Sequence, residues 1–333
     1  MAGEQIRPPD GEITNYTAGL WRHLPLPDGE PEPAPEYALD TFSFPGSSVV
    51  AARVRGKKHK HDGTNCDDWY EAASAGQITC IAVSDGAGSR KFSRIGAREA
   101  CRAAVSSLAE LLERDFSGRP EIWEHALLPA ADSRCTAAWG VLAEIVQKSV
   151  MRAAAAVEAA WGARTGKPAY ESLLGRELRL EDFSATLLAV VLVPTGGGEC
   201  LAAACQTGDG VIALLDTKTG LSPAVRLLGE ADSGDFSGET EFLTSPRMRR
   251  LESLQRRTRI TRCAVDTVFV MTDGVSDDYF PPSEGMPALY QDLRAAGVLG
   301  EATADAGQRL RQWLDSYAVR GSFDDRTLVI ARL

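Results

Sequence analysis

Apolar residues fall in short runs along most of the chain, and these runs predict β-strands. The segment "SSVVAARVRG", which begins at Ser47, alternates apolar with polar residues and ends in glycine. Other runs have the length and composition of strands buried on both faces. They cover residues 77–84, 185–193, 200–206, 210–215, 266–272 and 327–333.

Apolar residues at helical spacing predict two long helices, at 94–113 and 135–161, and a shorter one at 304–318. The strands come in runs and the helices in separate blocks, which indicates an α+β fold and not alternating βαβ units. We expect a layered sheet core with helices on the outside.

The first 45 residues differ from the rest. The stretch "LPLPDGEPEPAPEYALD" (24–40) is rich in proline and acid and has no periodic pattern. We therefore predict a flexible extension over 1–45 and one folded domain over 46–333. No apolar signal segment is present at the N-terminus, and the longest apolar run, 185–193, is too short to span a bilayer.

Composition and charge narrow the classes of function. The 333 residues are 44% hydrophobic and 25% charged, which is ordinary globular composition. A net charge of -10 argues against nucleic-acid binding, although the stretch 246–262 holds seven arginines and keeps that alternative open. A solvated face and a docking surface are the other interpretations of this stretch. Seven scattered cysteines without a C-x-x-C pair indicate a reducing, cytoplasmic location.

Acidic residues stand at the ends of the most apolar predicted strands. Asp85, Asp209 and Asp273 are each followed by glycine next to such a strand. Two acidic pairs also flank strands, Asp67–Asp68 and Asp324–Asp325. Asp-Gly is a common turn dipeptide, so any single site could be only a turn. Together, however, strand ends from one core converge, and clustered carboxylates are tolerable only around a cation.

Such a cluster would bind a hard divalent cation, because these cations prefer carboxylate, carbonyl and water oxygens as ligands. A glycine after the acid lets the backbone turn and bring a carbonyl to the ion. The four histidines and seven cysteines show no zinc spacing. The sequence therefore predicts a Mg²⁺ or Mn²⁺ site.

The motifs "AVSDGAGS", "TGDG", "MTDGVSDD" and "FDDRT", in this order, resemble the metal-dependent protein phosphatases of type 2C from about Ser47 to Leu333. The opening "GKKHKHDGTNCDD" is similar to that of a bacterial subgroup of this family. The resemblance implies a four-layer αββα sandwich, with two antiparallel sheets flanked by helices. It also implies that 218–262 is a flap-like segment beside the active site.

The resemblance further implies roles for single residues. Asp85 would bridge two Mn²⁺ or Mg²⁺ ions, the carbonyl of Gly86 would bind one ion, and Asp273 and Asp324 the other. The remaining acids would hold metal-bound waters or serve an additional ion; they are Asp67, Asp68 and Asp209.

Two departures from the family pattern concern the opening motif. The family's phosphate-binding arginine falls at Gly63, and Asp67 stands where the family has Glu or, in the subgroup, Gln. His59 falls at the subgroup's histidine and is a candidate for a phosphate contact or for a structural role. Lys57, Lys58 and Lys60 could supply positive charge instead, although a solvated basic turn also fits them.

The function implied is hydrolysis of phosphoserine and phosphothreonine in proteins by a water that bridges two metal ions. Cysteine-based chemistry needs Cys-x5-Arg, and the D-x-D-x-T route needs an acid where Ala87 stands; the sequence has neither. The alternative is an inactive signalling domain of the same fold that binds a phosphoprotein or a kinase. We expect a monomer with a phosphoprotein substrate and a Ser/Thr kinase as a further partner, but no nucleic-acid or membrane partner.

Overall fold

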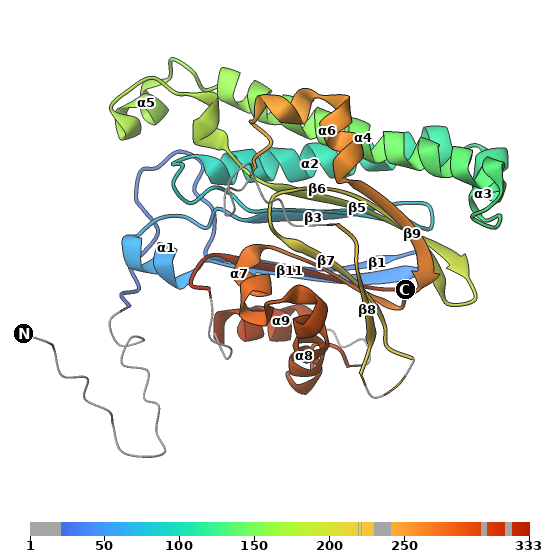
Figure 1. Ribbon diagram of the computed structural model, residues 1–333. Helices are drawn as coiled ribbons and strands as arrows, with labels where there is room; N and C mark the ends of the chain where they lie inside the picture. The colour runs from blue at the N-terminus through green and yellow to red at the C-terminus, as the bar shows by residue number, and fades with distance from the viewer. Residues whose placement is uncertain (1–20, 219, 221, 230–240, 301–304, 317–321) are drawn as a thin grey trace, which may run out of the picture.

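Two antiparallel β-sheets pack face to face in the computed structural model of the protein (Figure 1). The structure describes residues 21–333 except 219, 221, 230–240, 301–304 and 317–321. One sheet has the strand order β1-β2-β11-β10-β7-β8 and the other the order β3-β4-β5-β6-β9. The strands are β1 (Tyr37–Phe44), β2 (Ser47–Val54), β3 (Trp69–Ala75), β4 (Ile78–Ser84), β5 (Leu187–Gly196), β6 (Glu199–Thr207), β7 (Val211–Asp216), β8 (Ala224–Leu227), β9 (Thr258–Ala264), β10 (Thr267–Met271) and β11 (Arg326–Arg332).

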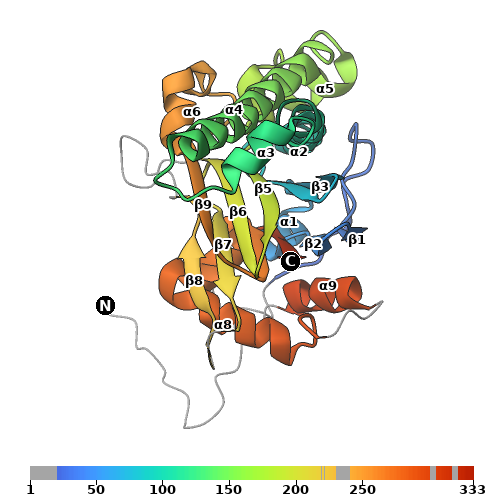
Figure 2. The ribbon, with the colours of Figure 1, turned by 90° about the vertical axis from the view of Figure 1, so that its right-hand side faces the viewer.

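Helices cover the outer face of each sheet (Figure 2). α2 (Ser93–Leu112) and α4 (Ser133–Gly162) lie on the five-stranded sheet, and α8 (Pro282–Ala295) and α9 (Ala306–Ser316) lie on the six-stranded sheet. This arrangement confirms the predicted αββα sandwich. The shorter helices are α1 (Lys57–Asp62), α3 (Pro120–Ala126), α5 (Pro168–Leu174), α6 (Leu251–Arg257) and α7 (Asp273–Ser276). No helix in the described ranges is long and apolar enough to cross a membrane.

The central strands are apolar on both faces because each sheet is covered on both sides. All seven residues of β4 are buried. Ile81 and Val83 belong to the cluster between the sheets, whereas Ile78 and Cys80 belong to the cluster under α2 and α4. A strand enclosed in this way has a continuous apolar sequence, which is why "QITCIAVS" was recognisable as one.

The predicted boundary at residue 46 is wrong, because folded structure begins earlier. β1 occupies residues 37–44 and pairs with β2, with Tyr37 opposite Val54. The preceding residues also contact the domain, since Arg55 Nη1 donates to the carbonyl of Leu24 at 2.9 Å. The proline-rich segment lacks periodicity but is held by its polar groups. Residues 1–20 of the predicted extension lie outside the described ranges.

Candidate metal and phosphate site

Strand register brings the predicted acids to one edge of the sandwich. In the five-stranded sheet, Ser84 at the end of β4 lies opposite Trp69 at the start of β3. Asp85 and Asp68 therefore leave their strands side by side. In the six-stranded sheet, Met271 at the end of β10 lies opposite both β7 and β11 near their first residues. The acids next to these strand ends emerge at the same edge: Asp209, Asp273 and Asp324.

Three of these acids form a tight cluster. Carboxylate oxygens of Asp85, Asp209 and Asp273 all lie within 4.8 Å of one another. Burial, followed by repulsion from Asp209, Asp277 and Asp324, raises the pKa of Asp273 to about 7. Burial and four neighbouring aspartates likewise raise the pKa of Asp85 well above its usual value. A divalent cation would relieve the repulsion within this cluster of carboxylate oxygens.

Asp68 is held rigidly beside the cluster. Its Oδ2 accepts hydrogen bonds from Thr272 Oγ1 at 2.9 Å and from Thr327 Oγ1 at 2.6 Å. Its Oδ1 is buried and has no partner among the described residues. A buried carboxylate oxygen without a donor fits a position that faces a cation or its water.

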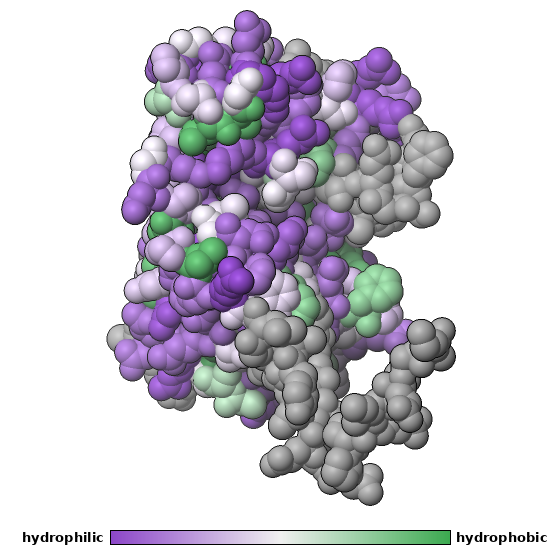
Figure 3. Space-filling view, turned by 90° about the vertical axis from the view of Figure 1, so that its left-hand side faces the viewer, coloured by the Kyte–Doolittle hydropathy of each residue, from purple (hydrophilic) through white to green (hydrophobic). Residues whose placement is uncertain are grey.

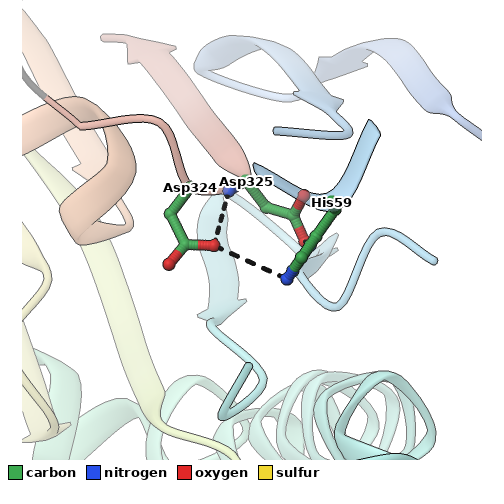
Figure 4. Close-up of side chains that lie close together, drawn as sticks. All are labelled: His59, Asp324 and Asp325. Carbon is green, nitrogen blue, oxygen red and sulfur yellow. Dashed lines mark hydrogen bonds and ion pairs between the residues drawn. The ribbon is translucent and has the colours of Figure 1, made fainter. Parts of the chain in front are cut away.

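His59 and Asp325 form a second cluster, with Asp324 beside it (Figure 4). His59 Nδ1 donates to Asp325 Oδ2 at 2.8 Å, whereas the buried Nε2 has no hydrogen-bond partner among the described residues. Nε2 lies 3.8 Å from Asp324 Oδ1 and 3.9 Å from Asp67 Oδ2. Burial disfavours the imidazolium, but the attraction of Asp325 and then of the other two acids raises the pKa of His59 to about 9.

Asp67 lies beside His59 and Asp325 of the second cluster. Burial is the largest influence on its carboxyl and raises its pKa to about 7, although His59 opposes this rise. Its backbone N–H donates to Asp325 Oδ2 at 2.5 Å. Sequence reasoning did not assign Asp325 a role of its own. The acidic pair in "FDDRT" was the available signal, but nothing in it distinguishes a metal ligand from an acceptor of backbone hydrogen bonds.

The basic residues of α1 separate into different environments. Lys58 Nζ lies 3.9 Å from Asp324 Oδ2, and its side chain is 51% exposed. Lys60 instead pairs with Asp315, and the ring of His61 packs edge-on against Trp21. A Cβ built on Gly63 would contact Leu24, so this position faces the N-terminal segment and not the acids. The face that carries α1 is mostly hydrophilic in its described part (Figure 3).

Two of the glycines beside the acids are required by close approach of neighbouring backbone. A Cβ on Gly86 would lie 2.6 Å from the carbonyl oxygen of Asp67. A Cβ on Gly274 would lie 1.9 Å from the carbonyl oxygen of Asp325. Glycine thus allows the loops that carry the acids to pack directly on one another, a reason that the sequence alone did not reveal.

The arginine-rich stretch 246–262 is partly occupied by contacts within the fold. Arg257 pairs with Glu241, and Arg262 Nη1 donates to the carbonyl of Leu127 at 2.8 Å. The stretch forms α6 and most of β9, an edge strand of the five-stranded sheet. These contacts favour the interpretation of a structural face over that of a nucleic-acid surface.

Comparisons with known proteins extend over most of the chain. Residues 55–315 match the family model described as Protein phosphatase 2C. Among solved structures, RsbX in complex with magnesium has 11% identity and a TM-score of 0.43, with 89% of this chain and 100% of that chain covered. A bacterial serine phosphatase has 12% identity and a TM-score of 0.46, with 85% and 96% covered. Serine/threonine phosphatase Stp1 from Staphylococcus aureus has 11% identity and a TM-score of 0.45, with 94% and 98% covered. No curated protein matches the chain.

Proposed function

The chain belongs to the protein phosphatase 2C family, and from this premise we propose that it hydrolyses the phosphate esters of phosphoserine and phosphothreonine in proteins. The observation that carries the proposal is the cluster of Asp85, Asp209 and Asp273, whose oxygens lie within 4.8 Å of one another. A structural role would not require three carboxylates to repel one another at the end of a buried core.

The clustered carboxylates fit a divalent cation, and we infer that two such ions bind here. We assign Asp85, Asp273, Asp324 and the carbonyl of Gly86 as ligands of Mn²⁺ or Mg²⁺, with Asp209 able to serve an additional ion. When bound, the ions would lower the pKa of a water and offset the charge on the phosphoryl oxygens.

The protein's own side chains would orient the reactants. Asp68, fixed by two threonine hydroxyls, would accept a hydrogen bond from the attacking water. Asp67, beside His59, would hold a second water. The unpartnered Nε2–H of His59 is the donor available to a phosphoryl oxygen or to the leaving serine oxygen. Lys58 Nζ, close to Asp324 and half-exposed, would attract the phosphate dianion in the absence of an arginine at position 63.

The test is phosphate release from a phosphoserine peptide with Mn²⁺ and with EDTA. We expect release with Mn²⁺ only, and at most a trace of it in Asp85→Asn, because this variant keeps the shape of the side chain but removes its charge. Asp115→Asn, a change just beyond the C-terminal end of α2, serves as the control and should retain activity. Near-full activity in Asp85→Asn would contradict the assignment.

A second candidate is a domain of the same fold that binds a phosphoprotein or a kinase without hydrolysis. Gly63 favours it, because this position faces Leu24 and supplies no cation to the site. Calorimetric titration with Mn²⁺, together with a measurement of phosphopeptide turnover, distinguishes the two. Tight binding of Mn²⁺ with no turnover of any phosphoserine or phosphothreonine peptide would favour the second candidate.

Substrate, partners and location complete the proposal. A phosphoprotein is the substrate, a Ser/Thr kinase is the further partner, and the protein acts as a monomer. A cytoplasmic location is supported by the seven cysteines, all unpaired and six of them buried.

A further inference from the structure

A separate cavity of about 150 Å³ opens beside Asp67. It is lined by the loop after Asp85, by the first turn of α2 and by the N-terminal segment. We call it the Arg90 pocket, and the lining residues that matter here are Glu30, Asp67, Gly88, Arg90, Lys91 and Arg94. Its walls carry three basic side chains and two acidic ones, Glu30 and Asp67, so basic groups are in excess although the whole chain has a net charge of -10.

The Arg90 pocket shares a wall with the candidate catalytic site. Asp67 lines the pocket and also lies 3.9 Å from His59 Nε2. Gly88 lines it as well, and a Cβ on Gly88 would lie 3.5 Å from His59 Nε2 and 3.7 Å from Lys58 Nζ. A substrate bound at the acids would therefore reach the pocket with a neighbouring residue.

Two of the three cations in the pocket are already paired. Lys91 Nζ forms an ion pair with Glu30, and Arg94 Nη2 lies 3.4 Å from the same carboxylate. Arg94 is buried and also donates to the backbone carbonyls of Glu32 at 3.0 Å and Lys91 at 2.7 Å. These contacts fix two positive charges in the wall of the pocket.

Arg90 differs from both. Its side chain is exposed, and its guanidinium makes no hydrogen bond or ion pair with any described residue. The carboxylate of Asp182 attracts it at longer range. A free guanidinium in the wall of a pocket can receive a carboxylate through two parallel hydrogen bonds. Lys91 and Arg94 add to this attraction, because they share the single carboxylate of Glu30.

We propose that the Arg90 pocket binds an acidic side chain of the phosphoprotein, within about three residues of the phosphoserine. The inference rests on the proposed phosphatase function and adds a sequence preference to it. The acidic surface of the protein repels acidic peptides in general, so this local cationic wall would select those that carry the acid at a fixed distance from the phosphate.

The test compares phosphoserine peptides that carry Glu or Gln at each of the three positions on either side of the phosphoserine. We expect kcat/KM to be about tenfold higher with Glu at one of these positions, the effect of one hydrogen-bonded charge pair. In Arg90→Gln the Glu and Gln peptides should have equal kcat/KM. In Arg90→Glu a peptide with Lys at the same position should have a higher kcat/KM than the Glu peptide. Arg119→Gln, an exposed arginine at the start of α3, at the other end of the molecule (Figure 1), should keep the ratio.

Hydrolysis of p-nitrophenyl phosphate in Mn²⁺, measured on the unmodified protein, separates the two proposals. If this small substrate is hydrolysed but Glu peptides have no advantage, or their advantage survives Arg90→Gln, the pocket assignment is overturned and the phosphatase assignment stands. If neither this substrate nor any peptide is hydrolysed, both are overturned. Because the Arg90 side chain is exposed and unpaired, thermal melting of Arg90→Gln should match that of the unmodified protein.

Discussion

The carboxylate of Asp325 joins three segments of the chain. It accepts hydrogen bonds from the backbone N–H groups of Gly56 at 2.6 Å and Asp67 at 2.5 Å, and from His59 Nδ1 at 2.8 Å. Burial alone would raise the pKa of this carboxyl, but His59 and the two N–H donors hold it below the usual value. Asp325 therefore stays charged and fixes the loops on either side of the candidate site.

Gly274 tests how closely these loops must pack. In Gly274→Ala the new methyl group would lie 1.9 Å from the carbonyl oxygen of Asp325, so the backbone at the end of β10 or at the start of β11 must move. We expect the free energy of unfolding to fall by about 1–3 kcal/mol or more. Metal-dependent activity should fall with it, because Asp273 and Asp324 are carried by the same two loops.

Gly140→Ala is the matched control for this change. Gly140 lies within α4, and a Cβ there would have no atom within 4 Å. Alanine is the better helix former by about 1 kcal/mol, so this variant should be slightly more stable. Urea denaturation measures the stability of both variants and of the unmodified protein. If Gly274→Ala were as stable as the unmodified protein, the loops at Gly274 could separate without cost.

At the scale of elements, the N-terminal segment 21–36 is held to the helices through Glu32. The Glu32 carboxylate accepts hydrogen bonds from Arg164 Nε at 2.6 Å, from Tyr170 Oη at 2.6 Å, and from Arg98. Arg98 belongs to α2, Arg164 follows the end of α4, and Tyr170 belongs to α5. One side chain thus fastens an otherwise irregular segment to three parts of the helical layer.

Glu32 gives this attachment a pH dependence. Burial of the carboxyl opposes ionisation, but Arg164, Tyr170 and Arg98 outweigh it and lower the pKa of Glu32 to about 2. A folded-state pKa below the ordinary value of 4.5 stabilises the protein fully above pH 4.5, and this contribution is lost as the pH falls toward 2. Glu32→Gln should therefore reduce the loss of unfolding free energy between pH 5 and pH 3.

Chemical denaturation at several pH values measures this slope. Glu144→Gln is the control, because Glu144 lies on the exposed face of α4 and pairs with Lys148, one turn away. Its slope should equal that of the unmodified protein. If Glu32→Gln also leaves the slope unchanged, Glu32 does not hold the segment in solution.

The elements that could be predicted from sequence are those whose pattern is local. The β4 and β10 strands are buried on both faces, and α2 and α4 have a long apolar stripe, so each was evident. β1 was missed because it lies at an edge and none of its residues is fully buried. β3 was missed because only two of its residues are buried.

The residues of the candidate site also fall into those that the sequence reveals and those that it does not. Acids at strand ends could be recognised because each lies next to an apolar run. The bonds of Asp325 could not, since they join residues 269 and 258 positions away along the chain. The pairing of Glu30 and Glu32 with arginines of the helical layer was equally hidden, because a proline-rich acidic segment resembles a flexible one.

At the scale of the whole molecule, the acid cluster should make stability depend on divalent cations. The native state gathers carboxylates that the unfolded chain disperses, so an ion that binds only the native state stabilises it. At 100 times its dissociation constant, such an ion adds about 2.7 kcal/mol. We expect Mn²⁺ or Mg²⁺ to raise the melting temperature, and EDTA to reverse this rise.

KCl at equal ionic strength is the control for general screening of the net charge of -10. Asp273→Asn should lose most of the rise caused by Mn²⁺. It should also melt at a higher temperature than the unmodified protein when metal is removed, since one repelling charge is gone. Calorimetry measures these melting temperatures. If KCl raised the melting temperature as much as Mn²⁺ does, a specific site for the divalent cation would be excluded.

The acids come from both layers of the sandwich. Asp85 follows β4 of the five-stranded sheet, whereas Asp273 follows β10 of the six-stranded sheet. A cation shared between them would join the two layers at one end of the molecule, where the carboxylates of Asp85 and Asp273 repel one another. It would add to the hydrogen bonds that Asp68 accepts from Thr272 and Thr327 across the same two layers. Removal of the ion by a chelator would then weaken the contact between the layers at that end first. The apolar cluster between the two sheets would still hold the rest of the layers together.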